Sequence, residues 1–67
     1  MSIILAYHPR VTINGVIITG DLNDYYSDTE ILESVKSKGF KCFQDVINYL
    51  KNYERLKLPE GELYIER

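Results

Sequence analysis

The stretch VTINGVIIT, residues 11–19, decides how this chain begins to fold. Two runs of β-favouring residues flank Asn14-Gly15, and a type I′ turn needs positive φ at both central residues, which Asn-Gly tolerates best. We therefore predict a β-hairpin with a two-residue loop. The loop fixes the strand register, because a shift by one residue would move every side chain to the wrong face. The predicted pairs are Ile13 with Val16, Thr12 with Ile17, and Val11 with Ile18.

The residues on either side of the hairpin carry different signals. The first strand could begin as early as Ile3, but His8-Pro9 interrupts it, because proline lacks the N–H that a sheet ladder needs. Residues 3–7 are therefore either a separate strand or the kinked start of a long one. After the hairpin, residues 20–24 read Gly-Asp-Leu-Asn-Asp, a composition that predicts a turn.

A well-marked helix follows the predicted turn. Ser27 is a suitable N-cap and Glu30 stands three residues later, which makes a capping box. Gly39 is a natural residue for the position just beyond the C-terminus of the helix. We expect this helix over residues 28–38. Its expected buried side chains are Ile31, Leu32 and Val35.

A second helix is expected over residues 43–55, because apolar side chains recur there at helical spacing. These side chains are Phe43, Val46, Ile47, Leu50 and Tyr53. Pro59 stops the helix, since it disfavours helical geometry at the residue before it. Residues 59–62 read as a turn, and residues 63–66 alternate in polarity as a half-buried strand does.

These elements predict one small α+β domain over residues 1–67, in the order β-β-α-α-β. A small antiparallel sheet, formed by the N-terminal β-hairpin and the C-terminal strand, packs against two helices on one face. The C-terminal strand could pair with the hairpin or with a second copy of the chain. A homodimer would add buried surface, which a domain of this size needs.

The composition restricts the function classes. The chain has 67 residues, a net charge of −2, one cysteine and one histidine. Cys42 cannot form an internal disulfide, and with His8 it falls short of the four ligands that a structural zinc site needs. A lone cysteine is typical of a reducing compartment, so we expect a cytoplasmic protein. The apolar run at residues 3–7 is too short to span a membrane, and we expect no membrane partner.

No arrangement of residues predicts catalysis, a bound metal or a cofactor, so we expect a non-enzymatic protein. His8 reads as a surface residue at a strand end, since the sequence assigns it neither a nucleophile nor companion ligands. Cys42 is expected to be a packed thiol, because free cysteine is among the most buried residue types. Residues 21–32 fail the calcium-loop pattern, which needs an oxygen ligand where Tyr25 stands and Glu where Leu32 stands.

Tyrosine is the residue type that stands out, with six copies and no tryptophan. It offers a large contact area with a polar tip and is enriched at protein interfaces, although a small core also uses it as half-buried cover. We hypothesise a small protein–protein interaction module of regulatory or accessory type. A free edge of strand 62–66 could also accept a partner strand. The candidate partner-binding residues are Tyr25, Tyr26 and Tyr64.

Two alternatives stay open. The first is a nucleic-acid-binding accessory protein that uses a basic spot, formed by Lys36, Lys38 and Lys41. The net negative charge weighs against it, because phosphate contacts dominate such affinity. The second alternative is a structural homo-oligomer. The richness in Ile, Lys, Asn and Tyr is typical of an AT-rich genome, which agrees with an accessory protein of a phage or mobile element.

Overall fold

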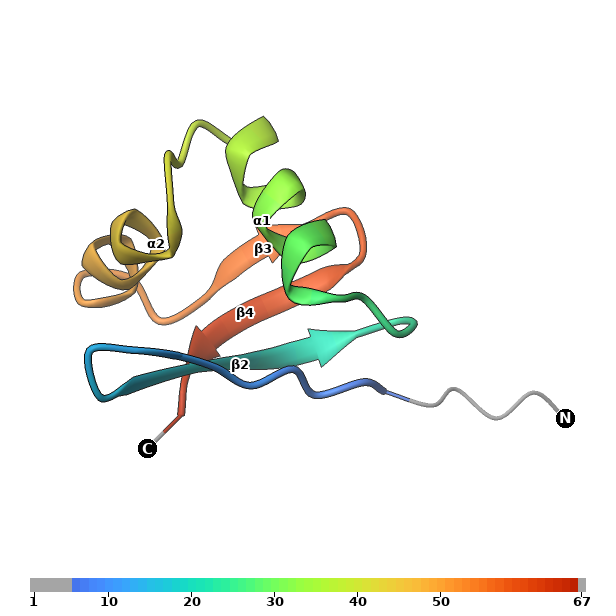
Figure 1. The fold of residues 1–67 in the computed structure, drawn as a ribbon. Coiled ribbons are helices and arrows are strands. Elements are labelled where there is room, and N and C mark those ends of the chain that lie inside the picture. Colours follow the sequence, from blue (N-terminus) through green and yellow to red (C-terminus); the bar gives the residue numbers. More distant parts are fainter. Residues whose placement is uncertain (1–5, 67) are drawn as a thin grey trace, which may run out of the picture.

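Two helices cover one face of a four-stranded antiparallel sheet in the computed structural model of this chain, which describes residues 6–66 (Figure 1). The predicted α+β class is confirmed, with one strand more than expected. The strands lie side by side in the order β1-β2-β4-β3. The elements are β1 (Val11–Ile13), β2 (Val16–Leu22), α1 (Asp28–Ser37), α2 (Phe43–Leu50), β3 (Leu56–Leu58) and β4 (Gly61–Ile65).

The N-terminal hairpin forms as predicted. β1 and β2 are antiparallel, and all three predicted residue pairs are present. Asn14 and Gly15 both have positive φ, 51° and 80°, a backbone conformation that most residues rarely adopt. The turn therefore selects the register, and the alternating apolar side chains of both strands reach the same face of the sheet.

The chain before the hairpin is the kinked start of the same edge strand. Tyr7 forms an isolated bridge with Leu22, with two backbone hydrogen bonds of 2.9 Å, and this pair continues the register of β1 and β2. Between the bridge and β1 lies Pro9, which has no N–H to donate to the ladder. Residues 3–5 of the predicted first strand lie outside the described residues.

β2 is longer than predicted. The turn expected over residues 20–24 begins only after Leu22, which is buried in the core. Gly20 lies opposite Leu63 of β4, and a Cβ atom on Gly20 would lie 2.1 Å from the carbonyl oxygen of Glu62. The prediction of a turn at Gly20 is wrong, because this glycine serves the close approach of two strands.

The predicted extension of the second helix beyond Leu50 is also wrong. The chain turns over residues 51–55 and then forms β3, in which buried Leu56 and Leu58 flank exposed Lys57. That alternation suits a strand with one buried face. Pairing of β3 with β4 outweighs the helix-favouring residues that precede it.

β4 lies inside the sheet, between β2 and β3. The C-terminal strand therefore pairs within the chain, which decides between the two pairings that the sequence left open. The predicted free edge of strand 62–66 is wrong as far as Leu63, because β3 occupies that edge up to the pair of Leu56 with Leu63. The error follows from reading the residues just before β3 as helix.

Both ends of α1 are capped as predicted. The backbone N–H of Ser27 donates to Glu30 Oε1 at 3.0 Å, and the N–H of Glu30 donates to Ser27 Oγ at 3.3 Å. Gly39 has a φ of 103°. The N–H groups of Gly39 and Phe40 donate to carbonyls of the last helical turn at 3.0 and 3.1 Å, which is a Schellman motif.

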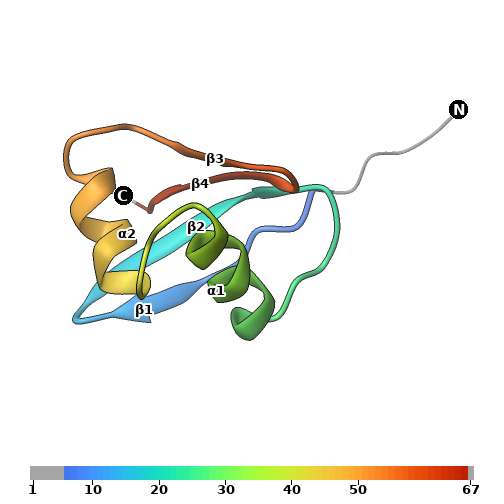
Figure 2. The ribbon, with the colours of Figure 1, turned by 90° about the horizontal axis from the view of Figure 1, so that it is seen from above.

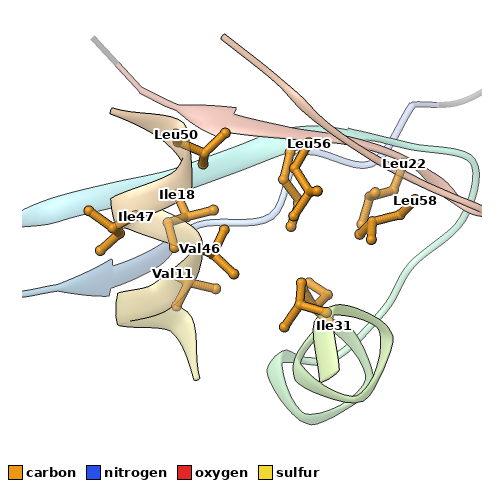
Figure 3. Close-up of a cluster of buried hydrophobic side chains, with 11 residues drawn as sticks. Val11, Ile18, Leu22, Ile31, Val46, Ile47, Leu50, Leu56 and Leu58 are labelled. Carbon is orange, nitrogen blue, oxygen red and sulfur yellow. The ribbon is translucent and has the colours of Figure 1, made fainter. Parts of the chain in front are cut away.

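The core lies between the helices and the sheet. Figure 2 shows both helices lying over the sheet, and Figure 3 shows side chains of helices and strands pointing into the layer between them. Because side chains alternate along a strand, the strand residues between these inward-pointing ones face away from the helices. The buried hydrophobic residues are Val11, Ile18, Leu22, Ile31, Val35, Val46, Ile47, Leu50, Leu56, Leu58 and Leu63.

We expect Gly20→Ala to unfold much of the protein. The added Cβ would meet the backbone of Glu62, so β2 and β4 would have to separate. Overpacking of this kind costs about 3 kcal/mol, in a domain size whose core supplies only about 3–5 kcal/mol. Urea denaturation followed by circular dichroism measures the loss.

The matched control is Gly39→Ala. A Cβ on Gly39 meets nothing within 4 Å, so this change penalises only the left-handed backbone. We expect that penalty to be about 1–2 kcal/mol. Equal losses for the two variants would contradict the close-approach role of Gly20.

Candidate functional site

Tyr25 stands on the surface next to Tyr7, at the end of β2. It is 65% exposed, and its ring centroid lies 5.0 Å from that of Tyr7 at an interplanar angle of 57°. Tyr26 is half-buried, packs against the core and donates its hydroxyl to Asn23 Oδ1 at 3.2 Å. We call Tyr7, Tyr25 and Tyr26 the tyrosine patch.

Hydrogen bonds hold the loop that carries Tyr25 and Tyr26. The N–H of Asn23 donates to the carbonyl of Glu60 at 2.8 Å, which ties the loop to the turn between β3 and β4. The N–H of Tyr25 donates to Asp24 Oδ1 at 2.7 Å, and the capping box at Ser27 fixes the far end of the loop. The backbone of Tyr25 is therefore held in place, so a partner would lose less binding energy in ordering this loop.

The sequence around the tyrosine patch is acidic. Asp24, Asp28 and Glu30 are all exposed, and none of them forms an ion pair within residues 6–66. Asp28 and Glu30 lie in the first turn of α1, where the helix dipole stabilises negative charge. The patch thus combines aromatic rings with a negative local potential.

Tyr64 lies on the opposite face of the sheet from the tyrosine patch. It alternates with buried Leu63, so its side chain faces away from the helices, whereas the tyrosine patch borders the helix-covered core. The Tyr64 hydroxyl donates to Asp21 Oδ1 at 3.4 Å, and the guanidinium carbon of Arg55 lies 4.7 Å from its ring centroid. The structure does not bring Tyr64 together with the other two predicted tyrosines.

Asp21 is the centre of a polar cluster on this open face. His8 Nδ1 lies 3.0 Å from Asp21 Oδ1 and 2.9 Å from the carbonyl oxygen of Gly20. Arg55 Nη1 donates to Glu62 Oε2 at 2.6 Å and lies 3.7 Å from Asp21 Oδ2. The hydrogen bond with Glu62 raises the pKa of Arg55. Since these side chains stay in contact with water, each pair contributes little to stability.

The pairing of His8 with Asp21 orients the histidine ring. Both partners of Nδ1 are acceptors, so Nδ1 carries a proton. A general base needs a nucleophile or substrate within hydrogen-bond reach. Within the described part of the chain no hydroxyl or thiol bonds to His8.

The basic spot lies next to a row of aromatic rings. Phe40 falls between two of the lysines in sequence, and its ring centroid lies 5.4 Å from that of Tyr49 in an edge-on arrangement. Tyr53 stacks on Tyr49 at 4.5 Å. The four-residue spacing of Tyr49 and Tyr53 could be read from the sequence, but the contact with Phe40 could not. All three lysines are exposed: Lys36, Lys38 and Lys41.

Cys42 is exposed, so the expectation of a packed thiol is wrong. It is the N-cap residue of α2, with an extended backbone at φ −160° and no capping hydrogen bond from its side chain. An N-cap residue stands outside the helix, and the next residue, Phe43, supplies the contact with the core. Position in the helix decides the exposure of this thiol, and residue type does not.

Within residues 6–66, no group of three or more His, Cys, Asp or Glu side chains is placed to hold a metal ion. No helix in this part of the chain is long and apolar enough to cross a membrane. Comparison with known proteins finds no matching family model, no matching curated protein and no matching solved structure. The function of the chain must therefore be inferred from its own geometry.

We expect Tyr25→Ala to leave the domain folded. Tyr25 is 65% exposed, so its removal costs mainly the aromatic pair with Tyr7, about 0.5–1.5 kcal/mol of unfolding free energy. Thermal denaturation measures this loss. The matched control, Tyr53→Ala, removes another exposed ring that stacks on a tyrosine. Unfolding of the Tyr25→Ala variant would show that Tyr25 is needed for the fold, and would contradict its assignment as a side chain available to a partner.

Proposed function

We propose that this chain is a small, non-enzymatic protein–protein interaction module of regulatory or accessory type, with the tyrosine patch as its principal contact. The supporting observation is that Tyr25 is 65% exposed although hydrogen bonds order its backbone. Aromatic side chains presented on a rigid scaffold are frequent anchors of interfaces. The exposed, lone Cys42 agrees with a reducing, cytoplasmic setting.

The charge around the tyrosine patch indicates the kind of partner that suits it. Asp24, Asp28 and Glu30 are exposed carboxylates close in sequence to Tyr25. Arg or Lys side chains of a partner would be attracted to these carboxylates and could lie over the tyrosine ring as cation–π contacts. The net charge of −2 adds to the attraction. We therefore infer a partner with a basic docking surface.

We expect Tyr25→Ala to lose the partner in affinity capture from a lysate of the native host, after nuclease treatment. An anchor residue of this kind is worth about 2 kcal/mol or more, so recovery of the partner, quantified by mass spectrometry, should fall at least about tenfold. Tyr53→Ala is the control and should retain the same protein as the unchanged chain.

Two outcomes would contradict this function. The first is equal recovery of the partner by Tyr25→Ala and by the unchanged chain, which would show that the tyrosine patch is not the contact. The second is recovery of the bait alone, together with a light-scattering mass above that of a monomer. That result would support the structural homo-oligomer instead.

Nucleic-acid binding is a second candidate function, and one observation favours it. The basic spot adjoins the aromatic row of Phe40, Tyr49 and Tyr53, and Tyr53 is 58% exposed. Proteins that bind single strands combine lysines on the phosphates with aromatic rings that stack on the bases. The net charge of −2 opposes this candidate, since phosphate contacts supply most of such affinity.

For this second candidate we expect binding of a short oligothymidine, measured by fluorescence anisotropy, to weaken steeply with salt. Replacing Lys36, Lys38 and Lys41 by Gln should reduce the slope of log affinity against log salt by about 2, at about 0.7 per phosphate contact. Tyr53→Ala should weaken binding by about 1–3 kcal/mol, while Tyr25→Ala should not change it. No anisotropy change at low salt would remove the candidate.

A further inference from the structure

A cavity of about 290 Å³ lies at the end of β4 where β3 has stopped pairing. The last pair of β3 with β4 joins Leu56 to Leu63, but β4 continues to Ile65. The turn between α2 and β3 lies at this same end of the sheet (Figures 1 and 2). The residues that line the cavity are Leu50, Glu54, Arg55, Tyr64 and Ile65, and we call it the β4 notch.

The β4 notch exposes backbone groups of the sheet. The N–H of Glu66 donates to the carbonyl of Ile17 at 2.9 Å, so Glu66 faces β2. Backbone direction alternates along a strand, so the N–H and C=O of Ile65 point to the other side, where β3 has ended. Within residues 6–66 neither group of Ile65 has a backbone partner. One pair of ladder hydrogen bonds is therefore open at this position.

The β4 notch also carries an unbalanced negative charge. Glu54 forms no ion pair within the described part of the chain. The positive charge of Arg55 is compensated by Glu62 at 2.6 Å and by Asp21 at 3.7 Å. Leu50 is buried and supplies an apolar wall. A side chain with an apolar stem and a positive end matches this combination of groups.

We propose that the β4 notch binds an extended peptide segment of a partner protein and takes one of its Lys or Arg side chains. The peptide residue opposite Ile65 exchanges two backbone hydrogen bonds with it, and its side chain lies on the same face, toward Leu50. The methylene stem packs on Leu50 and Ile65, and the charged end reaches Glu54. The cavity is at the small end of ligand pockets, which suits one side chain.

This contact goes beyond the proposed role of the tyrosine patch, because it uses backbone pairing at the other end of β4. Leu22, which pairs with Gly61, marks the end near the patch, and Ile18, which pairs with Ile65, marks the end with the notch. Loss of partner capture in Tyr25→Ala would therefore leave the β4 notch unaffected. Failure of the β4 notch to bind the peptide would likewise not contradict the proposed role of the tyrosine patch.

The test is a titration of the complete 67-residue chain, uniformly labelled with nitrogen-15, followed by amide NMR shifts. The probe is the blocked tripeptide Thr-Val-Lys, because residues after the Lys would meet Arg55 and Leu56, and the matched probe carries Glu in place of Lys. We expect the amide of Ile65 to shift and saturate with the Lys peptide and to shift less at every concentration of the Glu peptide. Glu54→Gln should weaken binding of the Lys peptide about two- to fivefold, as loss of an exposed ion pair does.

Glu33→Gln is the control variant, because it removes an exposed carboxylate of α1 outside the β4 notch and should not change the affinity. The proposal is overturned if the Ile65 amide does not respond to the Lys peptide, or responds equally to both peptides. Unchanged affinity in Glu54→Gln would also overturn it. So would an Ile65 shift that depends only on the concentration of the chain itself, because a second copy would then occupy the notch.

Discussion

The antiparallel pairing of β2 with β4 is the constraint on which the other parts of this fold depend. It joins residues 18–22 to residues 61–65, so the chain between them, which includes both helices, must close as one loop. The pairing also sorts the side chains. Ile18, Leu22 and Leu63 turn toward the helices and are buried, while residues of the other parity form the open face.

Several charged side chains on the open face of the sheet are paired with opposite charges from the same chain. Arg10 pairs with Glu66 at 3.2 Å, and Arg55 lies between two carboxylates and over the ring of Tyr64. An antiparallel sheet can leave one face in water when its residues are polar, so this face needs no covering layer. Tyr64 already has a cation over its ring and a carboxylate at its hydroxyl, so less of it is available to a partner than of Tyr25.

Local signals in the sequence predicted the parts of the fold whose partners are close along the chain. The hairpin at Asn14-Gly15 and the capping box at Ser27 each depend on residues within a few positions, and both are confirmed. Gly20 looked like a turn residue, because the strand that needs its missing side chain lies more than forty positions away, at Glu62. Leu56–Leu58 departs from this rule: its partner β4 begins three positions later at Gly61, but the helix-favouring residues before it hid the strand.

The candidate site was predicted only in part, for the same reason. The loop position of Tyr25 and Tyr26, and the exposure of Tyr25, follow from their place between a strand and an N-cap. The separation of these two tyrosines from Tyr64 could not be predicted, because it depends on which face of the sheet each side chain of β4 points to. The contact of Tyr25 with Tyr7 required the kinked edge strand to continue past Pro9, and a sequence pattern interrupted by proline leaves that continuation open.

The two outer edges of the sheet limit how another chain can reach its backbone. One edge is interrupted by Pro9, and the other is the three-residue β3, which carries exposed Lys57. The proline and the short, lysine-bearing strand both discourage another chain from adding a strand at these edges. Ile65 differs, because its backbone hydrogen bonds on the β3 side remain open within residues 6–66. The tyrosine patch lies at the other end of β4, four residues or about 13 Å farther along the strand at roughly 3.3 Å per residue. A partner that used both would need a folded surface across the sheet and could not bind as one short peptide.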